Sequence, residues 1–249
     1  LFNPNIFLTY YISEQEKFVS YSINLKDLLD LLFIGPIFTI LSFLLLKRIL
    51  DDLKAQGVPD GIITLCYVIF LIAIVMYNYG NAVHVTMSRL NHQIEEVYGS
   101  EQVYYSVYFL DEVFGHIFLS IGFFIIITEC CFLHTFNLNQ HKGSEDFSKF
   151  LMNKHEENWN LLFGLALGII TALSYAEGQC AFIFLILNPI ICFLLLIYSK
   201  KKDIKEKKNS MVMIFILMTI AFSITILLWG VFTGIKPFYP YFYQATELI

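Results

Sequence analysis

Charged residues are scarce in this sequence. Asp, Glu, Lys and Arg together make up 15% of its 249 residues, whereas a soluble globular domain contains about 25%. The five cysteines show no CxxC spacing, so the sequence lacks this signature of redox and zinc-binding motifs. Its one lysine-rich stretch lies between two apolar runs. These absences argue against a soluble domain and against binding to nucleic acid.

Apolar residues are abundant instead. The chain is 57% hydrophobic and 17% aromatic, and its mean hydropathy is +0.65. A membrane-spanning helix needs about 20 mostly apolar residues. The sequence therefore predicts an all-α integral membrane protein, a bundle of about six transmembrane helices that forms a single polytopic domain over residues 1–249. The predicted spans are residues 28–46, 61–87, 103–133, 159–175, 180–198 and 210–232.

The segments outside these spans are polar or rich in aromatic residues. We interpret residues 1–23 as an N-terminal segment at the membrane interface and residues 235–249 as an aromatic outer tail. Residues 134–158 and 199–209 are typical of cytoplasmic loops. Gly57 to Asp60 predicts a turn that leads into the second span, with Asp60 as its N-cap.

The distribution of Lys and Arg predicts the orientation. Cytoplasmic loops of membrane proteins carry an excess of these residues. In a six-span arrangement, 12 of the 16 fall on the side of the loops after spans one, three and five. The opposite side holds Lys17, Lys26, Arg89 and Lys236. Both termini are therefore expected on the outer side, most simply of the cell membrane.

Polar side chains gather where the second and third spans meet the outer side. His84 and Ser88 lie at the outer end of span two, and Asp111, Glu112 and His116 lie in the outer half of span three. An ionisable residue within a membrane span is costly, and it usually faces the bundle interior and serves a function. Because a short loop joins the two spans, we expect these side chains to lie close together.

The spacing of these residues suggests a metal site. Glu112 and His116 are four residues apart, so they can point toward one object on the same helix face. Imidazole and carboxylate groups are ligands for zinc and for iron. The sequence predicts a zinc or iron ion held by His84, Glu112 and His116, with an open position for water.

Three further residues are candidates for catalysis. Asp111 or Glu177 could orient a metal-bound histidine or act as the base that activates the water. Glu177 could equally be a helix-end residue at the interface. Asp111 and Glu112 are consecutive, so we expect only one of them to face the site, and the spacing to His116 favours Glu112. Ser88 shares a helix face with His84 and is the third candidate.

Ser88-Arg-Leu-Asn-His92 is similar to the Ser-xxx-His arrangement of the ceramidase-like membrane hydrolases. That group also has an Asp and a bound zinc ion. The resemblance covers five residues. The last span here has no histidine, whereas that group has a His-xxx-His pair on its last helix, and the number of spans differs. We therefore do not assign the chain to this family.

Several functions remain open from the sequence. The first is a metal-dependent membrane enzyme, of hydrolase type, that acts on a lipid or another apolar substrate. The second is a non-catalytic subunit of a larger membrane complex, in which the polar cluster holds helices together. The third is a b-type haem protein with His84 and His116 as axial ligands. The fourth is a transporter, because the break at Glu177 and the kink at Asn188-Pro189 resemble a pair of discontinuous helices, although the sequence shows no internal repeat. The expected partners are membrane lipids and, in the second case, other membrane subunits.

Overall fold

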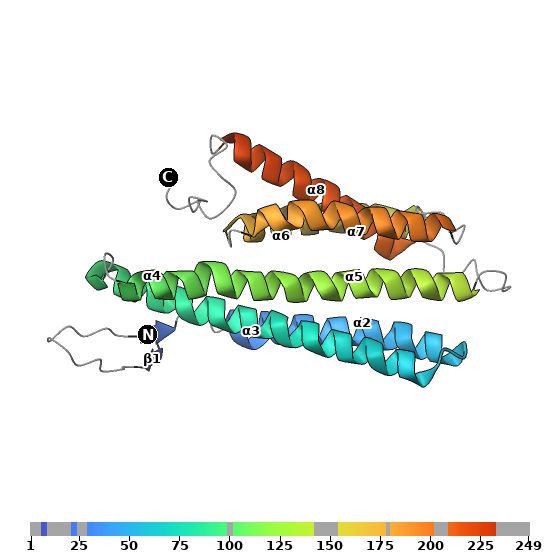
Figure 1. Cartoon of the computed structure of the whole chain (residues 1–249), viewed down its shortest axis with the longest axis horizontal. Helices are drawn as coiled ribbons and strands as arrows, with labels where there is room; N and C mark the ends of the chain where they lie inside the picture. The colour runs from blue at the N-terminus through green and yellow to red at the C-terminus, as the bar shows by residue number, and fades with distance from the viewer. Residues whose placement is uncertain are drawn as a thin grey trace. The chain divides into compact units, whose positions relative to one another are not determined.

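The structure is a computed structural model that describes residues 6–8, 21–23, 29–98, 102–141, 154–177, 180–201 and 209–232. Apart from two short strands, the turn at residues 56–59 and the single residues Cys180 and Asn209, the described residues form helices (Figure 1). The strands β1 (Ile6–Leu8) and β2 (Tyr21–Ile23) pair antiparallel, with Phe7 opposite Ser22. They belong to the segment that the sequence places at the membrane interface, and that placement stays a prediction.

The helices follow in chain order, and two of them have π-helical stretches at or near their start. The first two are the π-helix η1 (Asp30–Ile34) and α2 (Gly35–Ala55). Then come α3 (Asp60–Tyr98), α4 (Gln102–Tyr108), the π-helix η2 (Phe109–Gly115) and α5 (His116–His141). The last three are α6 (Lys154–Glu177), α7 (Ala181–Lys201) and α8 (Ser210–Phe232).

Within the described residues, six helical stretches are long and apolar enough to cross a membrane. This confirms the predicted number of candidate spans. One of the six, Gln102–Asn139, runs through α4, η2 and most of α5. The helices also extend beyond the predicted spans. The segment 134–158, predicted as a loop, is helical up to His141 and again from Lys154. Hydropathy marks the apolar part of a helix, but polar residues can continue its backbone hydrogen bonding.

The turn between the first two spans is confirmed. Gly57 has a φ of +84°, a conformation that favours glycine because it has no Cβ. Asp60 begins α3. Its carboxylate also forms an ion pair with Lys54, 2.9 Å away, so the pair bridges the turn.

The chain divides into two compact units. Unit 1 comprises residues Leu1–Ser42 and Ala73–Phe123, and unit 2 comprises Phe43–Ile72 and Phe124–Ile249. The helices α2, α3 and α5 each contribute residues to both units.

In unit 1, aromatic and polar contacts join the first turns of α2 to α3. The ring of Phe38 lies 4.5 Å from that of Tyr77 and 5.7 Å from that of Phe123 on α5, between ring centroids. The side-chain amide of Asn78 donates to the hydroxyl of Thr39 at 2.9 Å. Pairing of this kind satisfies polar groups in a helix that is otherwise apolar.

In unit 2, α6 packs along α8. The sequence Gly164-Leu-Ala-Leu-Gly168 places two glycines one helical turn apart on the contact face. A Cβ built on Gly168 would lie 2.4 Å from the carbonyl oxygen of Met218 and 2.7 Å from the Cβ of Ala221. Glycines at this spacing allow two helix backbones to approach closely. Around this contact the buried core includes Phe184, Phe215 and Phe222.

Asn209 fixes the start of α8. Its side-chain oxygen accepts from the backbone N–H of Val212 at 3.2 Å, and its amide donates to the hydroxyl of Thr135 at 2.9 Å. The first contact satisfies a backbone donor at the helix start. The second ties that start to α5.

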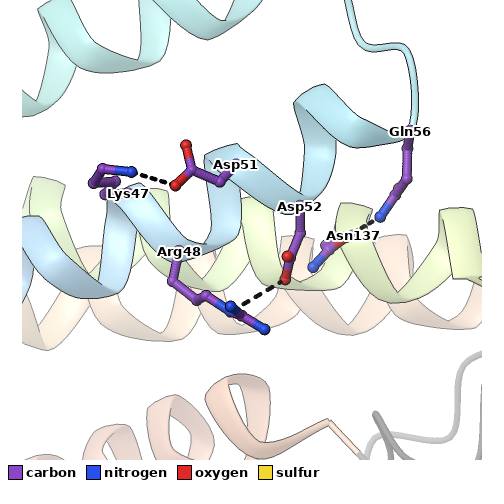
Figure 2. Close-up of polar contacts among 6 residues, drawn as sticks. All are labelled: Lys47, Arg48, Asp51, Asp52, Gln56 and Asn137. Carbon is purple, nitrogen blue, oxygen red and sulfur yellow. Dashed lines mark hydrogen bonds and ion pairs between the residues drawn. The ribbon is translucent and has the colours of Figure 1, made fainter.

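The last turns of α2 are polar (Figure 2). Lys47 pairs with Asp51, and Arg48 lies 3.7 Å from Asp52, each one turn along the helix. Beyond them, the side-chain amide of Gln56 donates to Asn137 of α5 at 2.7 Å. The two ion pairs contain exposed side chains, so they are expected to contribute little stability.

Candidate histidine–carboxylate site

Unit 1 brings four of the predicted site residues together. His84 lies on α3, Asp111 and Glu112 lie in η2, and His116 is the first residue of α5. We call these four residues the histidine–carboxylate cluster. Asp111, Glu112 and His116 are 1%, 6% and 3% exposed. Such burial of ionisable groups is unusual unless they are paired.

Glycines set the distance between the two helical segments that carry the cluster. A Cβ on Gly115 would lie 2.9 Å from the backbone nitrogen of His84 and 3.1 Å from its Cβ. One turn earlier on α3, a Cβ on Gly80 would lie 2.2 Å from the backbone nitrogen of Leu119. Larger residues do not fit at these two positions without a shift of backbone. The backbones therefore approach closely at the point where His84 must reach η2.

The π-helical turn changes which side chains can face α3. A π-helix closes its hydrogen bonds one residue further along than an α-helix, and such turns are rare and frequent at functional sites. Its turn is wider, so consecutive side chains diverge less. Asp111 and Glu112 are both buried, and each reaches a histidine of the cluster. Asp111 contacts His84 on the other helix, whereas Glu112 lies beside His116 on its own helix, and which of the two carboxylates faces a bound group stays a prediction.

His84 and Asp111 make the shortest contact of the cluster. Nδ1 of His84 lies 2.8 Å from Oδ1 of Asp111, which is a good hydrogen-bond distance. When Asp111 is ionised its carboxylate can only accept, and Nδ1–H of the imidazole then donates. In the neutral ring the lone pair is then on Nε2. Asp111 thus fixes both the orientation and the tautomer of His84, whose side chain is 27% exposed.

His116 packs against His84. Their ring centroids are 4.1 Å apart, with a tilt of 59° between the planes. Among the described residues, neither ring nitrogen of His116 has a hydrogen-bond partner, although Nε2 lies 3.9 Å from a carboxylate oxygen of Glu112. A buried polar group without a hydrogen bond is costly. The ring nitrogens of His116 therefore favour a bound water, ion or substrate group beside them.

The other predicted site residues are less informative. Ser88 is half-buried on α3, one turn beyond His84. Glu177 is the last residue of α6 and belongs to unit 2. Its side chain lies outside the described residues, as does that of His92. The roles proposed for Ser88 and Glu177 stay predictions.

The arrangement does not present a ready metal site. In the part of the chain that the structure describes, no group of three or more His, Cys, Asp or Glu side chains is placed so that it could hold a metal ion. The predicted ligands His84, Glu112 and His116 are neighbours, but the two imidazole rings contact each other directly. For the same reason there is no room for a porphyrin between them as axial ligands.

Two features of the site escaped the sequence analysis, namely the glycine contacts and the π-helical turn. A signal for the first was present. Gly80 lies four residues before His84, and Gly115 directly precedes His116, so each histidine has a nearby glycine. Glycine within a membrane helix often marks close packing against another helix. We find no comparable sequence signal for the π-helical turn.

The chain was compared with known proteins at three levels. It matches no family model, no curated protein and no solved structure.

Proposed function

We propose that this chain is a multi-pass membrane protein with both termini on the outer side, and that the histidine–carboxylate cluster is the active site of a hydrolase-type enzyme. The six long apolar helices and the bias of Lys and Arg support the membrane topology. The observation that carries the enzymatic part is the contact of 2.8 Å between His84 and Asp111. It gives an oriented imidazole next to His116, whose ring nitrogens have no hydrogen-bond partner among the described residues.

In the proposed reaction, His84 acts as the general base. Nε2 takes a proton from a water molecule as the oxygen attacks a carbonyl or related centre of the substrate. The bond from that centre to the leaving group then breaks, and Nε2–H gives the proton to the leaving group, which restores the neutral imidazole. The positive charge that forms on the imidazole is stabilised by Asp111 through Nδ1. His116, whose ring nitrogens have no hydrogen-bond partner among the described residues, is placed to donate to or accept from the reacting group.

The proposed substrate is a lipid or another apolar molecule that arrives from the membrane. Unit 1 has a surface hollow of about 430 Å³, which is lined by Gln102, Tyr105, Ser106, Phe109 and Leu110. The last two of these residues immediately precede Asp111 in η2. The hollow is lined mainly by apolar surface and opens widely to the outside. An acyl chain held there would be next to the segment that carries both carboxylates.

The zinc or iron ion expected from the sequence is a separate proposal. His84, Glu112 and His116 supply suitable donor types, and Asp111 would be the carboxylate that orients His84. Because the described residues do not present three donors arranged around one point, we derive no reaction step through a metal. Elemental analysis of the purified protein, with His84→Ala and His116→Ala variants beside it, decides the matter. Stoichiometric metal that is lost in both variants would establish the site.

The enzymatic proposal is tested with the full chain in liposomes. A mixture of lipid esters and amides is incubated with the protein, and the products are identified by mass spectrometry. We expect His84→Ala and Asp111→Asn to lower product formation by about 10²–10⁴-fold, the range typical for a positioned acid or base. His155→Ala is the control, because His155 is an exposed histidine on α6. Full turnover in His84→Ala, or none in the wild type, would rule out the proposal.

One observation favours a non-catalytic subunit as the second candidate. The hydrogen-bonding contact between His84 and Asp111 joins two helices of unit 1, and the glycines bring these helices so close that the cluster could serve simply to hold them together. In that case His84→Ala would lower the thermal stability of the protein and its yield in complexes with other membrane subunits. No lipid substrate would be turned over by the wild type.

A further inference from the structure

A second ionisable group lies within a predicted span, in unit 2. Glu129 is on α5, within the candidate span Gln102–Asn139. At a rise of 1.5 Å per residue, it lies about 15 Å along the helix from Asn139, the last residue of that span. Glu129 is separate from the histidine–carboxylate cluster, which belongs to unit 1.

The carboxyl oxygens of Glu129 are shielded from solvent, although the residue as a whole is only half-buried. Both Oε1 and Oε2 are buried, and neither has a hydrogen-bond partner among the described residues. No described Lys, Arg or His forms an ion pair with it either. In this respect Glu129 differs from Asp111, which is equally part of a membrane span but has His84 as its partner.

The helix around Glu129 packs on several sides. On α5, Phe124 contacts Phe184 and Phe132 contacts Tyr198, both on α7. The thiol of Cys131 reaches the carbonyl oxygen of Met211 on α8 at 3.5 Å.

Among the described residues, two thiols lie in electrostatic range of Glu129. They are Cys66 of α3 and Cys130, the next residue on α5. A thiol is a weak hydrogen-bond donor and carries no positive charge to balance a carboxylate. These two neighbours therefore do not stabilise the ionised form.

These observations point to a carboxyl group that binds a proton. An isolated carboxylate in an apolar medium is so costly that the group neutralises instead by binding a proton. We propose that Glu129 is a second functional site of this protein, a carboxylic acid that binds one proton within the membrane and exchanges it with water. On release, the O–H bond breaks, the electron pair stays on the carboxyl oxygen, and the proton passes to a water molecule.

A hydrophobic carbodiimide tests the proposal because it reacts with protonated carboxyl groups inside membranes. The carboxyl oxygen bonds to the central carbon of the reagent, and the acid proton moves to one of its nitrogens. The product rearranges to an N-acylurea without loss of any atom, so the peptide gains the whole mass of the reagent. The full chain in liposomes is treated with dicyclohexylcarbodiimide, digested and examined by mass spectrometry.

We expect the peptide that contains Glu129 to be labelled, and Glu129→Gln to abolish this labelling. Glu156→Gln is the matched control, because Glu156 is an exposed carboxylate on α6, and it should leave the labelling unchanged. His84→Ala should also leave it unchanged, which separates this test from the enzymatic proposal. Protection by added sodium or potassium would overturn the assignment in favour of a cation site.

A second measurement covers the case in which the reagent does not reach Glu129. The infrared spectrum of the wild type should contain a carbonyl band of a protonated carboxylic acid. This band should shift in heavy water, which shows that the proton exchanges, and should be absent in Glu129→Gln. A wild type without the band overturns the proposal, as does a band that does not shift in heavy water.

Discussion

Both units of this protein contain helices that approach closely over glycine, yet the two contacts have different neighbours. In unit 2, Gly164 and Gly168 of α6 meet α8, and the side chains around them are apolar. In unit 1, Gly80 and Gly115 bring α3 against η2 and α5, and the side chains at the crossing are histidines and carboxylates. Close approach is thus a common packing device, and the residues beside it decide whether it supports a core or a polar site.

Among the four variants considered below, the largest effect on stability is expected from Gly168→Ala. The added Cβ would lie 2.4 Å from the carbonyl oxygen of Met218, so the helix backbones must separate. Overpacking of this kind costs about 1–3 kcal/mol, and thermal unfolding in detergent would measure it. Gly61→Ala is the control, because its Cβ would meet nothing within 4 Å. Equal melting temperatures for the two variants would contradict the close contact between α6 and α8.

Gly115→Ala makes the matching change in unit 1. Its Cβ would lie 2.9 Å from the backbone nitrogen of His84, and the resulting shift should lengthen the hydrogen bond between His84 and Asp111. We expect product formation to fall about tenfold, which corresponds to about 1.4 kcal/mol in the activation barrier. The measurement is turnover per folded molecule. If Gly168→Ala lowers this quantity as much, the distinction between a structural and a functional glycine contact is lost.

A smaller effect is expected from Asn209→Ala at the start of α8. The variant loses the contact to the backbone N–H of Val212 and the hydrogen bond to Thr135. Loss of such a cap typically costs about 1 kcal/mol. Thermal unfolding should show this decrease, while turnover per folded molecule stays at the wild-type level. A loss of turnover would instead link unit 2 to the proposed active site.

The smallest effect is expected from Gln56→Ala. The hydrogen bond between Gln56 and Asn137 is 2.7 Å long and partly buried. A single hydrogen bond of this kind contributes about 0.5–1.5 kcal/mol. Chemical unfolding should detect a change within this range. A decrease in the free energy of unfolding well above this range would indicate that Gln56 stabilises unit 2 through more than this one hydrogen bond.

Much of the architecture could be predicted from the sequence. Hydropathy over about 20 residues located the six candidate spans, and Gly57 to Asp60 marked the turn between the first two. The helix ends could not be placed in the same way. Both α5 and α6 extend into the segment predicted as a polar loop, because backbone hydrogen bonding does not require apolar side chains.

The candidate site was only partly predictable. The sequence by itself determined which ionisable residues lie within apolar helices, because their cost in hydrocarbon marks them wherever they occur. Their pairing was decided by tertiary structure. The α-helical spacing favoured Glu112 over Asp111, but the π-helical turn lets both carboxylates reach a histidine. Spacing along one helix follows from local geometry, whereas the contact between His84 and Asp111 depends on how closely Gly115 lets two backbones approach.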